Sequence, residues 1–309
     1  MFLEGVFDDR QNELCSNCSQ SKSKRKKLLN KAKLNRMIDA DSALDILKIL
    51  SETDYSKSMA GVSDNNSFEE ILKNESERVY KFATDVAKDC QDCVKVFKLK
   101  GIFQNLKLTL KNKIKGESVE EIDEEYLGEY DLAMKEYEKN KDVQAAVILL
   151  DRLYFERLEK LCKKLDLEIL NEYFKLSLNS YNLLTFLRLK NQKRSYKYAK
   201  FCIFFDDDLL RIYEQDSNYI ASLEKYFDDK NMWSLYQKDQ KISVIEKVLE
   251  NKVVELIRKY KNINYGIEPV ITYILAKEYE MKAIRLIMTG KINKIPNEVI
   301  KERLREIYV

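Results

Sequence analysis

The sequence has 309 residues, and its 45% hydrophobic content is enough for a globular protein with sizeable cores. Two prolines, seven glycines and a charged fraction of 35% are typical of long helices joined by short polar loops, which argues against all-β and doubly wound folds. A net charge of +3, the absence of histidine and the lack of any glycine-rich phosphate loop argue against a nucleic-acid binder, a histidine-dependent enzyme and a standard nucleotide-binding protein.

The first 35 residues differ in composition from the rest of the chain. They hold a CxxC pair at Cys15 and Cys18 and a basic run from Lys22 to Lys33. Acidic residues near the start do not resemble a signal peptide, so we expect a cytoplasmic chain whose six cysteines are reduced. We interpret the basic run as solvated helix surface, with contact to anionic lipid or RNA as the alternative.

Helical spacing begins after this segment. The apolar residues from Ala43 to Leu50 predict a helix, and the polar stretch from Ser56 to Ser67 predicts a connector. A further helix is predicted from Phe68 to Leu110, with an interruption at Gly101. Its apolar stripe consists of Ile71, Leu72, Val79, Phe82, Ala83, Val86 and Ala87.

Three later helices have clearer signals. Apolar residues recur at three- and four-residue intervals from Val143 to Leu165 and from Ile242 to Tyr260. Pro269 fits the first turn of a third helix, and Gly290 suits a left-handed residue just past its end. Pro296 starts a short final helix by the same reasoning. No apolar run reaches the ~18 to 20 residues that span a bilayer.

A second CxxC pair, Cys90 and Cys93, falls inside a predicted helix. Together with Cys15 and Cys18 it could form a tetrahedral zinc site, although the separation far exceeds that of a compact zinc ribbon. At positions i and i+3 of a helix, two small buried residues that face a packing partner are the simpler interpretation. No βαβ pattern surrounds either pair, which argues against a thioredoxin-like role.

The chain also contains an internal repeat. Asn105, Asn182 and Ala283 each precede a lysine by eight positions, and the copies are 77 and 101 residues apart. The lysines are Lys113, Lys190 and Lys291, followed at a fixed spacing by Ser118, Ser195 and Pro296. Each copy predicts a long helix that ends near its lysine, a short polar turn, and a new helix that opens at Ser or Pro. Three copies predict three similar helical subdomains.

Several short motifs support an assignment to one family. In the C-terminal stretch from Gly266 to Val309 they are Glu268-Pro269, Tyr273, Glu278, Glu280, Ile284-Arg285, Gly290-Lys291, Pro296, Ile300, Arg303 and Leu304. Upstream they are LSETDY at Leu50 to Tyr55, NLK at Asn105, the segment Leu150 to Phe155, and Tyr181-Asn182 leading to Leu187-Arg188. With these motifs, residues 40 to 309 resemble the C/d family of V/A-type ATPases, whose eukaryotic members are called d.

Two segments depart from the family pattern. The family usually begins with a tyrosine-rich first helix, whereas this chain has CSNC at Cys15 to Cys18 followed by lysines. After the middle repeat the family often has a glycine-containing loop, but Phe201 to Leu210 contains no glycine. The contacts of that loop therefore cannot be transferred to this chain.

The resemblance implies an all-α, funnel-shaped protein with three similar helical subdomains in a pseudo-threefold arrangement. These would span residues 36–118, 119–195 and 196–309, after a divergent basic segment at 1–35. It also implies a non-catalytic central-stalk subunit, without cofactor or metal, that joins the shaft subunits to the membrane rotor ring at the cytoplasmic face. ATP hydrolysis elsewhere in the complex would then drive proton or sodium transport. The alternative is an unrelated helical scaffold or an adaptor with a basic N-terminal segment.

Eight polar residues at repeat or family positions are candidates for holding the subdomains together or contacting partners. On the predicted last long helix we expect Glu268, Glu280 and Arg285 to belong to one polar network, with contact to the shaft as the alternative. The others are Lys291, Asn105, Lys107, Asn182 and Arg188.

Overall fold

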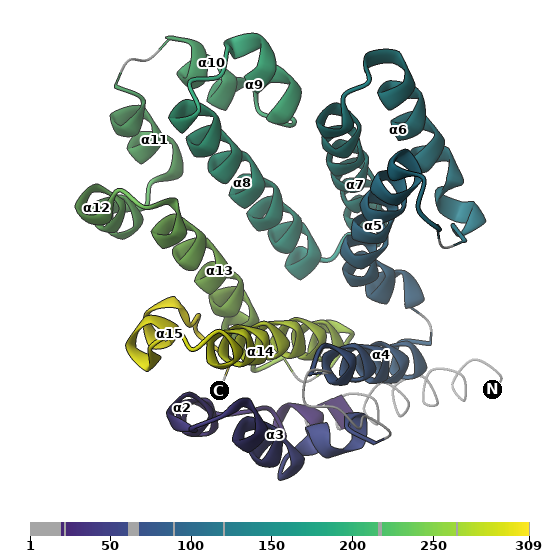
Figure 1. Cartoon of the computed structure of the whole chain (residues 1–309), viewed down its shortest axis with the longest axis vertical. Coiled ribbons are helices and arrows are strands. Elements are labelled where there is room, and N and C mark those ends of the chain that lie inside the picture. Colours follow the sequence, from purple (N-terminus) through teal and green to yellow (C-terminus); the bar gives the residue numbers. More distant parts are fainter. Residues whose placement is uncertain are drawn as a thin grey trace, which may run out of the picture. The chain divides into compact units, whose positions relative to one another are not determined.

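The computed structural model describes residues 20–21, 23–60, 68–88, 90–119, 121–215, 218–263 and 265–308. Figure 1 shows that the described chain is built of helices, and no strand occurs in these residues, which confirms the all-α prediction. The helices group into two units, one formed by residues 1–94 and 250–309 and the other by residues 95–249. The threefold arrangement and the division at 36–118, 119–195 and 196–309 stay predictions. No helix of the described part is long and apolar enough to cross a membrane.

The first unit is organised around one long helix, α14 (Glu268–Ile292). From Pro269 to Lys277 every residue of α14 is buried, so neighbours cover all sides of this half. The surrounding elements are α2 (Lys31–Asp39), α3 (Ala43–Ser51), the 3₁₀ helix η1 (Asp54–Ser58), α4 (Phe68–Val86) and α15 (Asn297–Arg303). Helices α2, α3, α4 and α15 pack directly on α14, so it is the core of this unit.

The second unit contains a succession of hairpin-like helix pairs. Its elements are most of α5 (Gln91–Lys115), η2 (Glu124–Tyr126), α6 (Leu127–Asn140), α7 (Val143–Leu165), α8 (Glu168–Asn191), α9 (Tyr196–Cys202), α10 (Asp207–Gln215), α11 (Tyr219–Phe227), α12 (Lys230–Asp239) and the start of α13 (Ile242–Lys259). Helix α7 packs on both α6 and α8, and α8 packs on α9. Part of the core is aromatic, with the Tyr181 and Phe204 rings stacked 4.9 Å apart and Phe155 against both.

Two helices predicted from apolar spacing alone, Val143–Leu165 and Ile242–Tyr260, are confirmed. Helix α7 has the predicted bounds, and Asp142 caps its start by accepting from the Gln144 and Ala145 N–H groups. Helix α13 ends one residue before the predicted limit. The single helix predicted from Phe68 to Leu110 is wrong, because α4 ends at Val86, α5 begins at Gln91, and Gly101 lies inside α5.

The three repeat copies have matching helix limits. Helices α5, α8 and α14 begin and end within one residue of the same repeat positions, and α9 and α15 correspond residue for residue. All three long helices also end in the same turn, with left-handed residues Gly116, Lys193 and Lys294. The next N–H donates back to Asn112, Leu189 and Gly290 O at 2.9, 3.0 and 2.8 Å, the bond of a Schellman cap.

Two predictions, one from the repeat and one from the helix at Pro269, are wrong. Ser118 does not start an α-helix, because the next element is η2 at Glu124, whereas Ser195 and Pro296 do stand at the start of α9 and α15. Gly290 is not the left-handed residue, because α14 continues to Ile292. Its small size has a packing reason instead: a Cβ there would lie 2.7 Å from Ile300 Cδ1 on α15.

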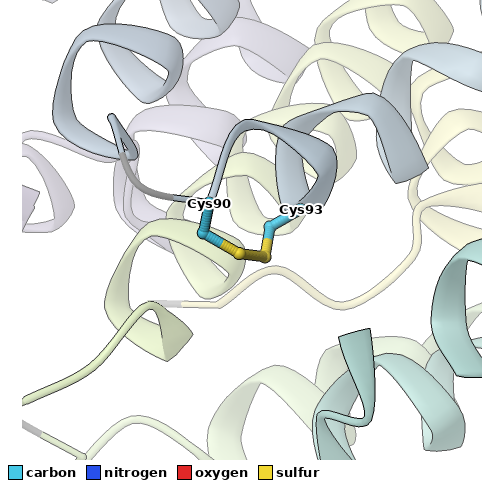
Figure 2. Close-up of a disulfide and its surroundings, with 2 residues drawn as sticks. All are labelled: Cys90 and Cys93. Atoms are coloured by element: carbon cyan, nitrogen blue, oxygen red, sulfur yellow. A yellow bond between two sulfur atoms is a disulfide. The ribbon is translucent and has the colours of Figure 1, made fainter. Parts of the chain in front are cut away.

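The cysteines also differ from the expectation. Figure 2 shows Cys90 and Cys93 joined by a disulfide at the start of α5, so these two are not reduced thiols as predicted. Cys162 and Cys202 are free and buried. Cys15 and Cys18 lie outside the described residues. A four-cysteine zinc site is incompatible with this disulfide, because zinc binds thiolates.

We expect substitutions at two helical glycines, Gly290 and Gly101, to change the stability in opposite directions. We expect Gly290→Val to lower the stability by about 1–3 kcal/mol, because the added atoms overlap Ile300. Gly101 has open space around its Cβ position, so Gly101→Ala should raise the stability by about 0.5–1 kcal/mol through lower chain entropy in the unfolded state. Thermal unfolding followed by circular dichroism measures both. A Gly290→Val melting temperature equal to that of the wild type would contradict the proposed packing against α15.

Candidate functional site

A cluster of buried charges lies inside the first unit. The Lys277 ammonium of α14 is 2.7 Å from Glu75 Oε1 of α4 and 2.7 Å from Glu280 Oε1 of α14. All three side chains have 3% or less of their surface exposed. The ammonium also lies 4.1 Å from the centre of the Tyr55 ring, a distance that permits a cation–π interaction.

The remaining lone pairs of both carboxylates are used by neighbouring donors. The Tyr55 hydroxyl donates to Glu280 Oε1 at 2.8 Å, and the Leu29 N–H donates to Glu280 Oε2. The Ser58 hydroxyl donates to Glu75 Oε2 at 2.6 Å. Burial, followed by the nearby Glu280 charge, raises the pKa of Tyr55 well above its usual value, so this hydroxyl remains a donor.

Arg78 extends the cluster to the edge of the unit. Its Nε and one terminal nitrogen each lie 2.8 Å from a Glu75 oxygen, and a terminal nitrogen also donates to Asp54 Oδ2 at 2.8 Å. Burial by itself would raise the pKa of Asp54, but the hydrogen bond and charge of Arg78 outweigh it and lower that pKa to about 2. Asp54 is therefore ionised across the physiological range.

This cluster fixes how α4, η1 and α14 meet. A lone buried ammonium or carboxylate costs several kcal/mol, so each charge requires its partners in place. Glu75 comes from α4, Tyr55 and Ser58 from η1, and Lys277 and Glu280 from α14. A shift of α14 by one residue along its axis would separate Lys277 from Glu75 and Glu280 from Tyr55.

The three candidates on α14 do not form the single network that the sequence suggested. Glu280 lies in the cluster. Arg285 forms a two-pronged ion pair with Glu69 of α4, at 2.8 and 3.1 Å from its Nε, and both side chains are about half exposed. Glu268 lies in the first turn of α14, a position that the helix dipole favours for a carboxylate. Lys291, near the end of α14, donates to Asn297 Oδ1 at 2.6 Å.

The candidates in the second unit have separate roles in the structure. Asn182 is fully buried, and its side-chain amide bonds both the backbone N–H and the C=O of Phe204 at 3.0 and 2.8 Å. This fastens the segment after α9 to α8. Lys107 pairs with Asp151, and Arg188 pairs with Glu246. Asn105 is exposed on α5.

The basic run near the N-terminus is only partly solvated. Arg25 is 6% exposed and donates to Lys261 O at 3.2 Å, so the interpretation as solvated surface is wrong for this residue. Lys24 lies 5.2 Å from the centre of the Phe82 ring, and burial lowers its pKa. Lys26 and Lys27 are exposed, and Lys22 lies outside the described residues.

Sequence reasoning missed Lys277, which holds the centre of the cluster. The available signal was a lysine at the end of PVITYILAK, where the apolar residues cover every face of a helix. A charge in such a helix must find a buried partner, and Glu280 at i+3 was the local candidate. Glu75 could not be inferred, because it is about two hundred residues away in the chain. Among the described residues, no group of three possible metal ligands occurs.

The fold and its interior define a class of protein: a helical chain whose buried charges hold helices together. The model of the ATP synthase (C/AC39) subunit family matches residues 18–133 and 125–303. The chain belongs to this family. The alternative of a scaffold unrelated to rotary ATPases is therefore wrong.

Two relatives match over nearly the whole chain. One is the C subunit of the A-type ATP synthase of Methanocaldococcus jannaschii, 23% identical, with 92% of this chain and 84% of the relative covered. Another is the C subunit of the V-type sodium ATPase of Enterococcus hirae, 22% identical, with 91% and 94% covered. The chain is thus similar to proteins of both A-type and V-type ATPases.

Removal of the central ammonium should destabilise the first unit strongly. Lys277→Met removes the counter-ion of the buried Glu280 and leaves Glu75 with Arg78 alone, and we expect a loss of about 3–5 kcal/mol in the free energy of unfolding. Lys301→Met, which removes an exposed pair with Asp39, should change it by less than about 0.5 kcal/mol. Urea unfolding measures both. Equal losses in the two variants would show that the cluster does not hold the helices together.

We expect the ion pair between Asp54 and Arg78 to stabilise the fold at neutral pH and to lose this effect in acid. Because the folded-state pKa of Asp54 is lowered to about 2, the pair stabilises the fold above the unfolded pKa of about 4, and this contribution is lost as the pH falls towards 2. Asp54→Asn should be less stable than the wild type at neutral pH and should lose less on acidification. Unfolding measured from neutral to acidic pH checks the slope, with Asp39→Asn as the exposed control. Parallel profiles for Asp54→Asn and the wild type would refute the assignment.

Proposed function

We propose that this chain is a non-catalytic central-stalk subunit of a V/A-type rotary ATPase. Its task would be to couple the rotating shaft to the membrane rotor ring, so that ATP hydrolysis in other subunits drives proton or sodium transport. The observation that carries the proposal is the family match, which runs through both units of the chain. Both relatives described above are named as C subunits of such complexes.

The interior of the first unit supports a mechanical role. Its buried charges are engaged with one another, with Tyr55, Ser58 and a backbone N–H, and they serve to fix the packing of α4 and α14. A protein that transmits torque needs helices that do not slide past one another, and buried ion pairs oppose such sliding. We place the chain at the cytoplasmic face of the membrane, as a peripheral part of the complex.

The two relatives leave the transported ion open between protons and sodium. The Enterococcus hirae relative is named as part of a sodium ATPase, whereas the Methanocaldococcus jannaschii relative is named as part of an ATP synthase. A central-stalk protein would not touch the ion itself, so its residues do not choose between them. The eight candidate residues stay predictions as partner contacts.

The proposal predicts a stoichiometric complex with the shaft. Native mass spectrometry of the purified chain mixed with the shaft subunits of its own organism's V/A-type ATPase should show a one-to-one assembly at low and moderate salt. The peripheral-stalk subunits of the same complex, which do not rotate, serve as the control and should not bind. A folded, helical chain that leaves the shaft subunits free would refute the central-stalk role.

A further inference from the structure

Two pockets lie at equivalent repeat positions, one in each unit. Lys282, Leu286 and Thr289 of α14 line a pocket of about 340 Å³ in the first unit. Tyr181, Thr185 and Arg188 of α8 line a pocket of about 480 Å³ in the second unit. These are the same three positions of the repeat, since each pair of residues is 101 apart in sequence. The same face of the long helix is therefore hollow in both copies.

The pocket of the first unit combines cations with an apolar floor. The lining contains three cations, Lys282, Arg285 and Arg305, and one carboxylate, that of Glu250, while Arg285 pairs with Glu69 outside the lining. Arg305 pairs with Glu250, and Lys282 Nζ is 3.7 Å from Glu250 Oε1. The floor contains Tyr279, Ala283 and Leu286, of which the first two are buried. The lining thus carries more positive than negative charge beside apolar surface.

The lining of the second pocket also contains more cations than carboxylates, with Arg188 and Arg194 against Asp151. Asp151 pairs with Lys107, and Arg188 pairs with Glu246. The Arg194 guanidinium contacts only neutral groups in the described chain, namely Gln192 Oε1 at 3.3 Å and the ring of Tyr198 with its centre at 5.1 Å. An exposed guanidinium at the rim is therefore available to an incoming carboxylate.

The third copy of the repeat leaves the same face uncovered. Its equivalent residues on α5 are Gln104, Leu108 and Lys111, and all three are exposed. Leu108 is 57% exposed, which is high for a leucine in a folded helix. The opposite side of the helices is packed, since Leu183 and Phe186 on α8 and Ile284 and Ile287 on α14 are fully buried. This face is thus exposed on α5 and only partly covered on α8 and α14, where Tyr181 stacks on Phe204 and the other residues line the pockets.

We propose that this face of α8 in the second unit and the equivalent face of α14 in the first unit are each a docking surface for an acidic segment of a partner protein. A carboxylate side chain of the partner would enter each pocket and bind the cations, while aliphatic side chains next to it cover the apolar lining. Charge-assisted bonds to guanidinium and ammonium groups are strong, and they are stronger when a partner excludes water. A protein segment fits better than a free anion, because an inorganic phosphate would leave the apolar floor of the first pocket unfilled. The inference deepens the proposed function, since it assigns the shaft subunits as the acidic partner.

Charge reversal in the pockets tests the proposal directly. Binding of the purified shaft subunits is measured for Lys282→Glu, for Arg194→Glu and for the wild type. Each variant should weaken binding about tenfold or more, because a carboxylate then faces a carboxylate. The matched controls are Lys31→Glu in the first unit and Lys175→Glu on α8, both exposed and outside the pockets. If a charge-reversal variant has a lower melting temperature than the wild type, Lys282→Gln and Arg194→Gln are used in its place.

A second measurement does not depend on the choice of partner. The complex is isolated from the organism's membranes, and lysines and arginines are labelled with acetylating and dicarbonyl reagents in the complex and in the purified chain. Lys282 and Arg194 should be protected in the complex, whereas Lys31 and Lys175 should react in both samples. Protection from labelling shows that the pockets are covered in the complex, whichever of its proteins covers them.

The combined outcomes separate the two proposals. Wild-type binding with unchanged affinity in the pocket variants overturns the docking surface and leaves the central-stalk role in place. Failure of the wild type to bind the shaft overturns the central-stalk role; protection of Lys282 and Arg194 then still supports an acidic docking partner elsewhere in the complex. Full labelling of both residues in the complex overturns the docking surface in either case.

Discussion

The Lys277 ammonium, held between Glu75 and Glu280 inside the first unit, is the interaction on which the rest of that unit depends. It lies at the end of the half of α14 in which every residue is buried, where an unpaired charge would not be tolerated. The pairing therefore determines the position of α14 against α4 and η1. Replacement by apolar residues of similar volume could be as stable, so the distinctive contribution of the pair is to specify one register of the helices.

The same C-terminal cap occurs at the ends of the three long helices, α5, α8 and α14. Gly116, Lys193 and Lys294 take the same left-handed conformation, and the following N–H closes the same backbone bond. The surroundings of the three repeat lysines nevertheless differ. Lys113 is exposed, Lys190 donates to Tyr213 O and lies over the Tyr213 ring, and Lys291 donates to Asn297. The repeat thus preserves the backbone turn, while each copy has its own side-chain contacts.

Enclosed charges and accessible charges have different roles in this protein. Inside the first unit, carboxylates and cations are paired and enclosed, as in the contact of Arg78 with Glu75 and Asp54. On the open face of α8 and α14, cations exceed carboxylates and lie next to hollow surface. Enclosed pairs hold helices in place, whereas accessible surplus charge selects a partner. The central-stalk role that we propose would need both kinds of charge.

The sequence by itself determined the helical class, the family and the limits of a few helices, such as α7 and α13. Val143–Leu165 followed from apolar spacing and the repeat register from three lysines, because these signals are local and the helix period is short. Only the tertiary structure explains why position 290 requires a glycine, because Ile300 of the next helix packs closely against it. It also decided that one helix ends at Val86 and the next begins at Gln91, with Gly101 inside the second, and that Lys277 meets Glu75. Such facts depend on residues brought together across long stretches of chain, and no local pattern encodes which distant partner a buried charge will meet.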